Sequence, residues 1–577
     1  MRDVIEVKEK TCPTVPTTIS LVVAIANKIL NELDVVNEVN KAVGWTYDPR
    51  GMSPGNLMKI FILSTFTDVR VPLTHLEERT AGFDLLYLIG YEALDHAVNA
   101  FNMGRALERL GKEGSDCEGM YEKIALHALQ KYNIPTERTH GDTTTISFYG
   151  EYDLESMNIP ADEMEAALEI EKGYNKDGRP GDKQAVVGQV VTDQGIPVSN
   201  RVMDGATSDI EWNRIALDYL EKVRSQGFSQ GIFVADCKLM IEEHVRRMNA
   251  PESRVEFVSR CPANFNDSLE KRMIEKAYKD GNWQEIGQVA EGKKNCSYRA
   301  TPIIETVFGT QMRLLVLESS SLVEAAGRSL AKIEGQAQPL VKAIEKREFA
   351  CKEDAEKELE LFNRRKELRM FDYVAEITRM EKERWPRGRR NEKTRPVKEE
   401  KHVIRINGLR FNEALRQSHL QNESSFVLMS NVTDGTTTDK NLLEIYKGQQ
   451  IVENSFRQLK APNMASVIYL KNPLRIKGLV TILCLSLLIR ALIQYRMRAG
   501  LKEFNESNPD AVIRAGWAGR PLANPTFHLL YENSINCFYE RVSSTEYNFV
   551  WSSPKIQDRV EPLLGLMGLS VSTLLQG

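Results

Sequence analysis

Apolar and polar residues in the first 132 positions repeat at spacings of three and four, which is the pattern of amphipathic helices. The repeat is clearest in two stretches, TISLVVAIANKILNELDVVNEVNKAV and FNMGRALERLGKEG. Turn-forming residues interrupt it at YDPRGMSPGN and at Gly114. The pattern predicts an all-α N-terminal domain over residues 1–132.

Beyond YNIPTER the pattern changes to that of strands, rich in β-branched and aromatic residues. THGDTTTISFYGEY predicts a first strand, and QAVVGQVVTDQGIPVSNRVMDG predicts a hairpin around the turn TDQG. A helix, an apolar strand, a short helix and another strand follow: DIEWNRIALDYLEKVRSQG, GIFVADCKL, IEEHVRRMNA and RVEFVSRCP. A meander followed by alternating helices and strands predicts a mixed α/β sheet over residues 133–265.

Residues 266–425 break this alternation. Strand-like pieces in YRATPIIETVFGTQMRLLVLES precede a long, charged, helix-rich stretch from Ser321 to Arg384. No apolar heptad persists there, so we expect a packed helical hairpin rather than a coiled coil. A basic run, Lys382–Lys401, overlaps its end with nine Lys or Arg against four Glu. Runs of this kind are more often solvated linkers than binding sites.

A strand-like stretch, SSFVLMSNV, resumes the sheet pattern, and residues 426–505 are expected to complete that domain. The next segment, YKGQQIVENSFRQLK, predicts one amphipathic helix. At about 100° per residue, its polar side falls within an arc of about 80°. That arc holds Tyr446, Gln449, Glu453, Arg457 and Lys460. The simplest interpretation of the helical Glu is a solvated i, i+4 ion pair between Glu453 and Arg457.

The longest apolar run extends from Gly478 to Ile489 and is ended by Arg490. It falls well short of the roughly 20 residues that span a bilayer, so it predicts a buried helix. The N-terminus, MRDVIEVKEK, lacks the apolar core of a signal peptide. Residues 506–577 are expected to form a C-terminal tail with a helix in NPTFHLLYENSINCFYERV. No membrane partner is expected.

Composition narrows the class of protein. A chain of 577 residues with 42% hydrophobic and 27% charged residues is typical of a soluble globular protein with several domains. The eight cysteines form no CxxC pair and no Cys/His cluster, so neither a zinc site nor a disulfide framework is indicated. A reducing cytoplasm fits best. A net charge of −4 means that any contact with DNA must come from local patches.

Two aspartates lie where open α/β sheets place their chemistry. Asp142 lies in the first predicted strand, and Asp236 ends the apolar strand IFVAD. Helix capping is an equally simple role for Asp236. If both converge with Glu453, they suit two Mg²⁺ or Mn²⁺ ions about 3.5–4 Å apart, which act on the two sides of a phosphodiester.

The trio Asp142, Asp236 and Glu453 carries a family resemblance. Together with the spacing Y-x2-Q-x3-E-x6-K from Tyr446 to Lys460, it resembles the DDE transposases of bacterial insertion sequences with a Tyr-Arg-Glu-Lys signature. The similarity extends from about residue 18 to the end of the chain. It also includes HGDTTTISFYGEY, GYNKDGRPGDKQAVVGQVVTDQGIPV, DGATSD, VADCKL, YLKNPLRIKGLV and NPTFHLL.

The resemblance implies an RNase H-like catalytic core with a large insertion domain, residues 266–425, before the Glu-bearing helix. The chain between Asp236 and Glu453 is far too long to be explained as a loop. The resemblance also implies hydrolysis at the inverted-repeat ends of double-stranded DNA and joining of the 3′ hydroxyl to target DNA. A homodimer on paired ends in the bacterial cytoplasm is expected. Which domain reads the ends stays open, with the N-terminal helical domain as the first candidate.

The resemblance assigns the rest of the polar arc to DNA. Tyr446 and Lys460 are implied contacts to phosphate oxygens. Gln449 stands where the signature has Arg, which removes a charge and a bidentate fork. Gln is frequent there in the branch that this chain resembles, and Lys447 or Arg457 could supply the missing charge. In a preceding polar loop, Lys176 and Arg179 are candidates for DNA contact, with a solvated loop as the alternative.

Three other functions stay open. An RNase H-like nuclease without strand transfer would not need the insertion or the Tyr-to-Lys helix. A catalytically inert, transposase-derived DNA-binding regulator would not need the intact acid trio. A scaffolding protein built on the helix-rich residues 321–384 would account for none of the acid spacing.

Overall fold

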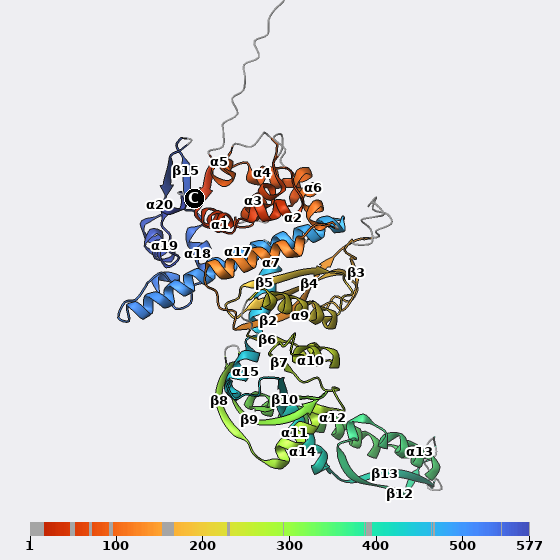
Figure 1. The fold of residues 1–577 in the computed structure, drawn as a ribbon. Coiled ribbons are helices and arrows are strands. Elements are labelled where there is room, and N and C mark those ends of the chain that lie inside the picture. The colour runs from red at the N-terminus through yellow and green to blue at the C-terminus, as the bar shows by residue number, and fades with distance from the viewer. Residues whose placement is uncertain are drawn as a thin grey trace, which may run out of the picture. The chain divides into compact units, whose positions relative to one another are not determined.

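The computed structural model describes residues 17–46, 52–67, 72–91, 96–112, 114–152, 167–227, 231–291, 294–385, 387, 395–462, 464–465, 468–543 and 545–575. The chain folds into two compact units (Figure 1). Unit 1 consists of Met1–Leu239, Arg247–Glu256 and Gly448–Gly577, and unit 2 of Met240–Arg246 and Phe257–Lys447. The five-segment division predicted from the sequence remains a prediction.

Helices dominate the first part of unit 1, where the sequence pattern predicts them. They are α1 (Leu21–Glu32), α2 (Val35–Ala42), α3 (Pro54–Ser64), α4 (Leu76–Thr80), α5 (Leu85–Ile89), α6 (Ala100–Gly111) and α7 (Cys117–Lys131). Their starts follow capping rules: the side chains of Ser20, Ser53 and Asn99 each accept a hydrogen bond from a backbone N–H in the first turn. These caps place the helix boundaries close to the turn residues in the sequence.

A small sheet joins the two ends of unit 1. The strand β1 (Thr18–Ser20) pairs with β15 (Phe538–Arg541), which pairs with β16 (Tyr547–Val550). The helix expected in NPTFHLLYENSINCFYERV is therefore confirmed only in part, as α18 (Phe527–Ser534). Strand pairing with β1 determines the conformation of the remainder, and pairing with so distant a segment leaves no local pattern.

The apolar run near residue 480 is the middle of α17 (Pro473–Ser507), a buried helix as expected but much longer than the run. It lies beside α7 in Figure 1 and also packs against α1, α3 and α6. Its length and composition would suit a membrane span, yet 89% of its most apolar window is buried inside the protein. Glycines allow the close crossing with α6, because a Cβ at Gly478 would lie 2.3 Å from the Leu107 carbonyl oxygen.

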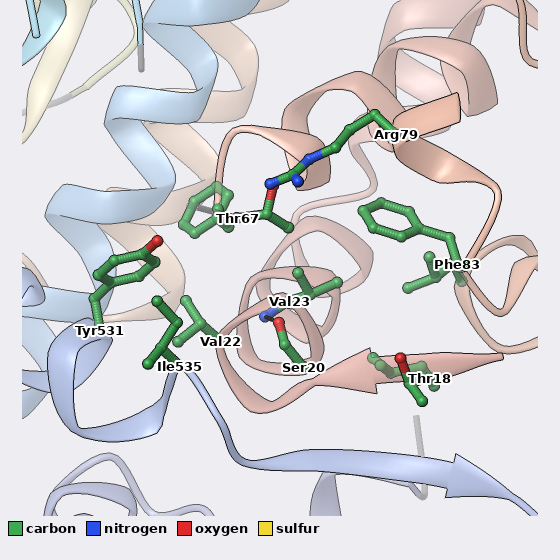
Figure 2. A pocket seen from close by; sticks show the side chains of 13 residues that line it. Thr18, Ser20, Val22, Val23, Thr67, Arg79, Phe83, Tyr531 and Ile535 are labelled. Carbon is green, nitrogen blue, oxygen red and sulfur yellow. Dashed lines mark hydrogen bonds between the residues drawn. The ribbon is translucent and has the colours of Figure 1, made fainter. Parts of the chain in front are cut away.

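A pocket of about 280 Å³ is lined by β1, α1, α4, α5 and α18 and by the residues that follow some of these helices (Figure 2). Its lining is about equally polar and apolar, and Val22, Phe83 and Ile535 are among its apolar side chains. The Arg79 guanidinium is its charged group and donates to the Thr67 hydroxyl.

The sheet of unit 1 contains the predicted meander. Its strands are β2 (Arg138–Phe148), β3 (Glu171–Lys172), β4 (Lys183–Thr192), β5 (Pro197–Met203) and β6 (Ile232–Ala235). The strands β2, β4 and β5 are antiparallel, and β6 runs parallel to β2. The hairpin around TDQG is confirmed: Gly195 takes a φ of +83° and its N–H donates to the Thr192 carbonyl. Unit 1 is thus mixed α/β.

Helices cover both faces of this sheet. On one face, α9 (Asp209–Ser225) packs Trp212 against Gly188 of β4, where a Cβ would lie 2.2 Å from the indole. On the other face, α16 (Gln450–Leu459) packs Val452 and Phe456 against Val191. The sheet is therefore buried on both sides, consistent with its nearly continuous apolar strands.

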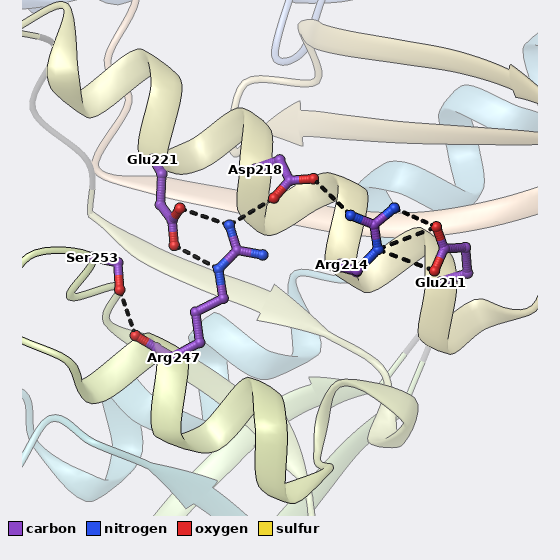
Figure 3. A network of polar contacts seen from close by, with 6 residues as sticks. All are labelled: Glu211, Arg214, Asp218, Glu221, Arg247 and Ser253. Carbon is purple, nitrogen blue, oxygen red and sulfur yellow. Dashed lines mark hydrogen bonds and ion pairs between the residues drawn. The ribbon is translucent and has the colours of Figure 1, made fainter.

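Charged side chains fasten the end of α10 (Glu242–Asn249) to α9 (Figure 3). The Arg247 guanidinium donates to Glu221 at 2.6 and 2.7 Å and to Asp218 at 2.7 Å. The following residues lead to Glu256, whose carbonyl accepts a hydrogen bond of 2.8 Å from Phe233 N–H of β6. The network thereby supports the strand that precedes Asp236.

Unit 2 contains an antiparallel sheet of five strands. In spatial order these are β7 (Phe257–Arg260), β14 (Ser425–Ser430), β10 (Thr310–Ser319), β9 (Lys294–Val307) and β8 (Gln284–Glu291). The helices α11 (Leu269–Asp280) and α14 (Glu413–Ser424) pack against this sheet, and α15 (Asp439–Lys447) ends the unit.

The helix-rich stretch predicted from Ser321 to Arg384 is wrong at its end. Two helices, α12 (Ser320–Glu345) and α13 (Lys352–Asn363), are followed by the strand β12 (Phe371–Arg384). It joins β13 (Val397–Phe411) and β11 (Glu348–Phe349) in a separate sheet. Both helices pack on that sheet through residues such as Ile344 and Phe362, and α12 also packs against α14. Pro386 and residues 388–394 of the basic run lie outside the described residues.

Candidate active site

The strands β2 and β6 bring two candidate acids to one place. They pair in parallel, with His140 opposite Val234. The same register continued by two residues places Asp142 beside Asp236, which directly follows the end of β6. The neighbouring strands expected from the sequence are therefore observed, and their two carboxyl groups lie close enough to repel each other.

A lysine joins Asp142 to a third aspartate. Asp142 Oδ1 accepts a hydrogen bond from Thr143 N–H at 2.7 Å and lies 3.3 Å from Lys176 Nζ. Lys176 Nζ lies 3.0 Å from Asp209 Oδ1, which also accepts a hydrogen bond of 2.6 Å from the Thr143 hydroxyl. The three charged side chains are 22–25% exposed, so solvent reaches them only in part.

Partial burial and the charges of neighbouring groups shift the pKa values of Asp142, Asp236 and Lys176. Burial raises the pKa of Asp142, and the charge of Asp209 adds to the increase, although Lys176 and Thr143 N–H oppose it. Burial, then the charges of Asp209 and Asp142, also raise the pKa of Asp236. Burial alone would lower the pKa of Lys176, but both neighbouring aspartates more than offset this and raise it. The carboxylates of the site are therefore stabilised by a positive charge placed between them.

The donor chemistry fits a hard divalent ion. Mg²⁺ is usually held by one or two carboxylates together with substrate phosphates, and Asp142 and Asp236 provide such a pair. Within the described residues, no group of three or more His, Cys, Asp or Glu is arranged to hold a metal ion. Completion of the set by Glu453 therefore remains a prediction.

The segment expected to be one helix from Tyr446 to Lys460 is two. The helix α15 ends at Lys447 and α16 begins at Gln450, with a break at Gly448. Glycine is a poor helix former, which accounts for the break. Tyr446 lies on α15, so the single continuous helix from Tyr446 to Lys460 is wrong. Its contact with DNA remains a prediction.

Contacts beneath α16 place it on the Asp142 face of the sheet. Asp142 is paired with Gln189 of β4, and paired residues point to the same face. The Ser455 hydroxyl of α16 donates to Gln189 Oε1 at 2.8 Å. Glu453 and Arg457 are exposed on this helix, and no ion pair joins them in the part of the chain that the structure describes. The solvated ion-pair interpretation is therefore wrong for these residues.

The two candidate loop cations lie on an exposed loop, and each has a partner within the protein. Lys176 binds the aspartates, and Arg179 Nη1 donates to the Tyr149 hydroxyl at 2.6 Å. Lys460 at the end of α16 donates to Asp177 of the same loop at 2.7 and 2.9 Å. Gln449 is half-buried at the start of α16, where its side chain makes no capping hydrogen bond. The roles of Gln449, Arg457 and Lys460 in DNA binding remain predictions.

Asp209 is the site residue that the sequence did not single out. It is the first residue of α9, directly after the N-cap Ser208. An acid at that position has an ordinary explanation, because carboxylates stabilise helix N-termini. The stretch DGATSD carries a capping signal, but no local pattern shows that its last residue meets Lys176.

The pocket of Figure 2 is a separate feature, since none of the candidate acids or cations lines it.

Comparison with known proteins assigns no family. No protein-family model matches the chain, and no curated protein matches it. Among solved structures, the chain is similar to the piggyBac transposase synaptic complex with hairpin DNA, with a TM-score of 0.36 and 7% sequence identity. That alignment covers 96% of this chain and 81% of the other. A TM-score this low establishes neither a shared fold nor a shared function.

Proposed function

We propose that this chain is a metal-dependent DNA transposase of the DDE type, from the insertion-sequence group with the Tyr-Arg-Glu-Lys signature. The observation that carries the proposal is the parallel pairing of β2 with β6, which brings Asp142 next to Asp236. Two partly buried, mutually repelling carboxylates suit a divalent ion and phosphate oxygens better than they suit a structural role.

The arrangement of strands supports an RNase H-like core. In the larger sheet of unit 1, β5, β4 and β2 are antiparallel neighbours in that order, and β6 pairs in parallel with β2. The helix α16, which carries Glu453, packs on this sheet but follows the long chain segment Phe257–Lys447 of unit 2. A core interrupted before its Glu-bearing helix is what the resemblance implies.

In the proposed reaction, Asp142, Asp236 and Glu453 hold two Mg²⁺ or Mn²⁺ ions. When bound, such ions activate a water or a 3′ hydroxyl and stabilise the leaving oxygen of the phosphodiester. Arg457 on the exposed side of α16, with Gln449 and Lys460 at the two ends of that helix and Tyr446, would bind the DNA strand near the reacting phosphate. The substrates are the inverted-repeat ends of the element and target DNA, bound by a homodimer in the bacterial cytoplasm.

Three isosteric substitutions test the proposal: Asp142→Asn, Asp236→Asn and Glu453→Gln. Each removes one metal ligand charge, so each should abolish Mg²⁺-dependent cleavage and joining of end DNA while leaving DNA binding intact. Glu506→Gln, at the exposed end of α17, is the matched control and should remain fully active. Cleavage retained in any of the three variants would remove that residue from the site.

The substrate design separates the alternatives. Pre-cleaved ends supplied with target DNA give a joined product only with a transposase. A nuclease without strand transfer cuts intact ends but joins nothing. An inert regulator shifts the DNA in a gel and never cuts it in Mg²⁺ or Mn²⁺. The inverted repeats themselves are read from the DNA that flanks the coding region.

A further inference from the structure

The loop that carries Lys176 is anchored to the end of β2 by its neighbour Asn175. Asn175 is buried, and its Nδ2 donates to the Ser147 hydroxyl at 3.0 Å. Its Oδ1 accepts hydrogen bonds from Asp177 N–H and Arg179 N–H at 2.9 and 3.2 Å. Lys176 N–H donates to the Thr145 hydroxyl at 3.2 Å. The backbone at Lys176 is thus held in place independently of its side chain.

From this anchored position the Lys176 ammonium reaches the acid site. It lies 3.3 Å from Asp142 and 3.0 Å from Asp209. Within the described residues, no other Lys, Arg or His forms an ion pair with either carboxylate. Its charge offsets part of the repulsion among these two acids and Asp236. The Lys176 ammonium therefore occupies a position in which a bound cation would reduce the same repulsion among the carboxylates.

We infer that Lys176 is a positioning residue that occupies the cation position beside Asp142 and Asp209, and that it leaves this position when a divalent ion binds. The inference rests on the proposed metal-dependent function. If Asp142 held a divalent ion, the ammonium would be repelled at close range and would lose this carboxylate as its partner. The released side chain, still anchored at its backbone, then becomes a donor for a DNA phosphate oxygen.

Direct measurement of metal binding tests the competition. Mn²⁺ is titrated into the full-length protein and free Mn²⁺ is followed by electron paramagnetic resonance, with Lys176→Met, Lys176→Arg and the control Lys172→Met. Lys172 is exposed and precedes Lys176 by one short stretch of chain. Without its internal competitor, Lys176→Met should bind Mn²⁺ about tenfold more tightly, equivalent to about 1.4 kcal/mol. Lys176→Arg should stay close to wild type, and Lys172→Met should not change.

Chemical acetylation tests the displacement itself. The protein is treated briefly with acetic anhydride with and without saturating Mn²⁺, and acetylation of each lysine is measured by mass spectrometry. Lys176 is held in two ion pairs without metal, so its acetylation should increase severalfold when Mn²⁺ is added. Lys172 should react equally in both conditions. This readout needs no DNA and no catalytic turnover.

The outcomes separate the two proposals. Mn²⁺ binding that Asp142→Asn abolishes supports the metal site, whatever Lys176 does. Equal or weaker Mn²⁺ binding by Lys176→Met overturns the inference about Lys176 alone, because a merely structural lysine would lower metal affinity when removed. Unchanged acetylation overturns it as well. A wild-type protein that binds no Mn²⁺ at Asp142 overturns both.

Discussion

Lys460 of α16 donates to both carboxylate oxygens of Asp177, at 2.7 and 2.9 Å. Asp177 is the chain neighbour of Lys176, which binds Asp142. The helix that carries Glu453 and the loop that reaches the aspartate pair are therefore joined by one ion pair. The Lys460 side chain is only 25% exposed, and its charge is shared with an acid before any DNA is present.

This ion pair predicts an unusual effect on DNA binding. Asp177→Asn removes a negative charge beside Lys460 and frees its ammonium for phosphate, so affinity for end DNA should rise a few-fold. Lys460→Gln should lower affinity and reduce the salt dependence by about one counterion. Fluorescence anisotropy across a series of salt concentrations measures both effects.

A control variant excludes a general charge effect. Glu506→Gln also removes one acid from an exposed ion pair, with Lys502, far along α17 from the candidate site. Its DNA affinity should equal that of wild type. If Asp177→Asn and Glu506→Gln behave alike, Lys460 has no special part in binding DNA.

The α6–α17 crossing predicts a large effect from a single methyl group. In Gly478→Ala, the new Cβ would lie 2.3 Å from the Leu107 carbonyl oxygen, so the helices must separate. Overpacking of this kind should lower the free energy of unfolding by about 1–3 kcal/mol. Gly565→Ala, in α19 (Pro554–Leu566), meets nothing within 4 Å and should raise stability by up to about 1 kcal/mol. Thermal unfolding followed by circular dichroism compares the two.

A buried carboxylate in α7 predicts that removing the acid and removing one of its cationic partners lower the free energy of unfolding by different amounts. Glu122 is 2% exposed and binds both Arg201 of β5, at 2.5 Å, and Lys222 of α9, at 2.7 Å. Glu122→Gln leaves the largely buried Arg201 without a counter-charge, so it should cost about 3–5 kcal/mol. Lys222→Met should cost no more than about 1 kcal/mol, because that side chain is 51% exposed. Equal losses in urea denaturation would contradict this order.

Lys59 in α3 predicts a dependence of stability on pH. It is 3% exposed, and its ammonium donates to Asn31 Oδ1 and to the Leu88 carbonyl. Burial lowers its pKa from 10.5 to about 8. Between these values the unfolded chain binds the proton and the folded chain does not, so stability rises with pH across that window.

The variant Lys59→Met lacks this titration. Relative to that variant, the wild-type protein should gain about 3 kcal/mol between pH 8 and 10.5. Unfolding by urea at several pH values in this range measures the difference. Lys502→Met, which removes an 81% exposed lysine, should follow the wild-type curve. Parallel curves for Lys59→Met and wild type would show that Lys59 stays charged in the fold.

Local pattern predicts much of this fold. The spacing of apolar residues indicates α1 to α7, and strand alternation with TDQG indicates β2, β4 and β5. The pairing of β1 with β15 joins segments near opposite ends of the sequence and leaves no local trace. The strand β12 was hidden because its surface is mostly charged and exposed, as in a solvated helix. The secondary structure of such segments is determined by pairing with strands that are distant in the sequence.

Local pattern predicts one part of the candidate site, and the other part depends on tertiary contacts. The meeting of Asp142 with Asp236 is predictable, because Asp236 ends an apolar strand and Asp142 lies in a strand expected to be its neighbour. The bridge from Lys176 to Asp209 is not, because it depends on how a polar loop and the first turn of α9 meet across β2. The helix break at Gly448 was visible as a glycine, but its effect on Tyr446 depends on where each helix packs.

The position of α17 in the chain sets the order in which the protein can mature during synthesis. The helix α7 ends at Lys131 and α17 begins only at Pro473, yet α1, α3, α6 and α7 all pack against α17. At about 5–20 residues per second, roughly 17–70 s of translation pass before these helices meet their apolar partner. Throughout that interval the nascent chain exposes to chaperones and to other chains the apolar helix surfaces that α17 later covers. The assembly of unit 1 is therefore timed by the synthesis of the last part of the chain.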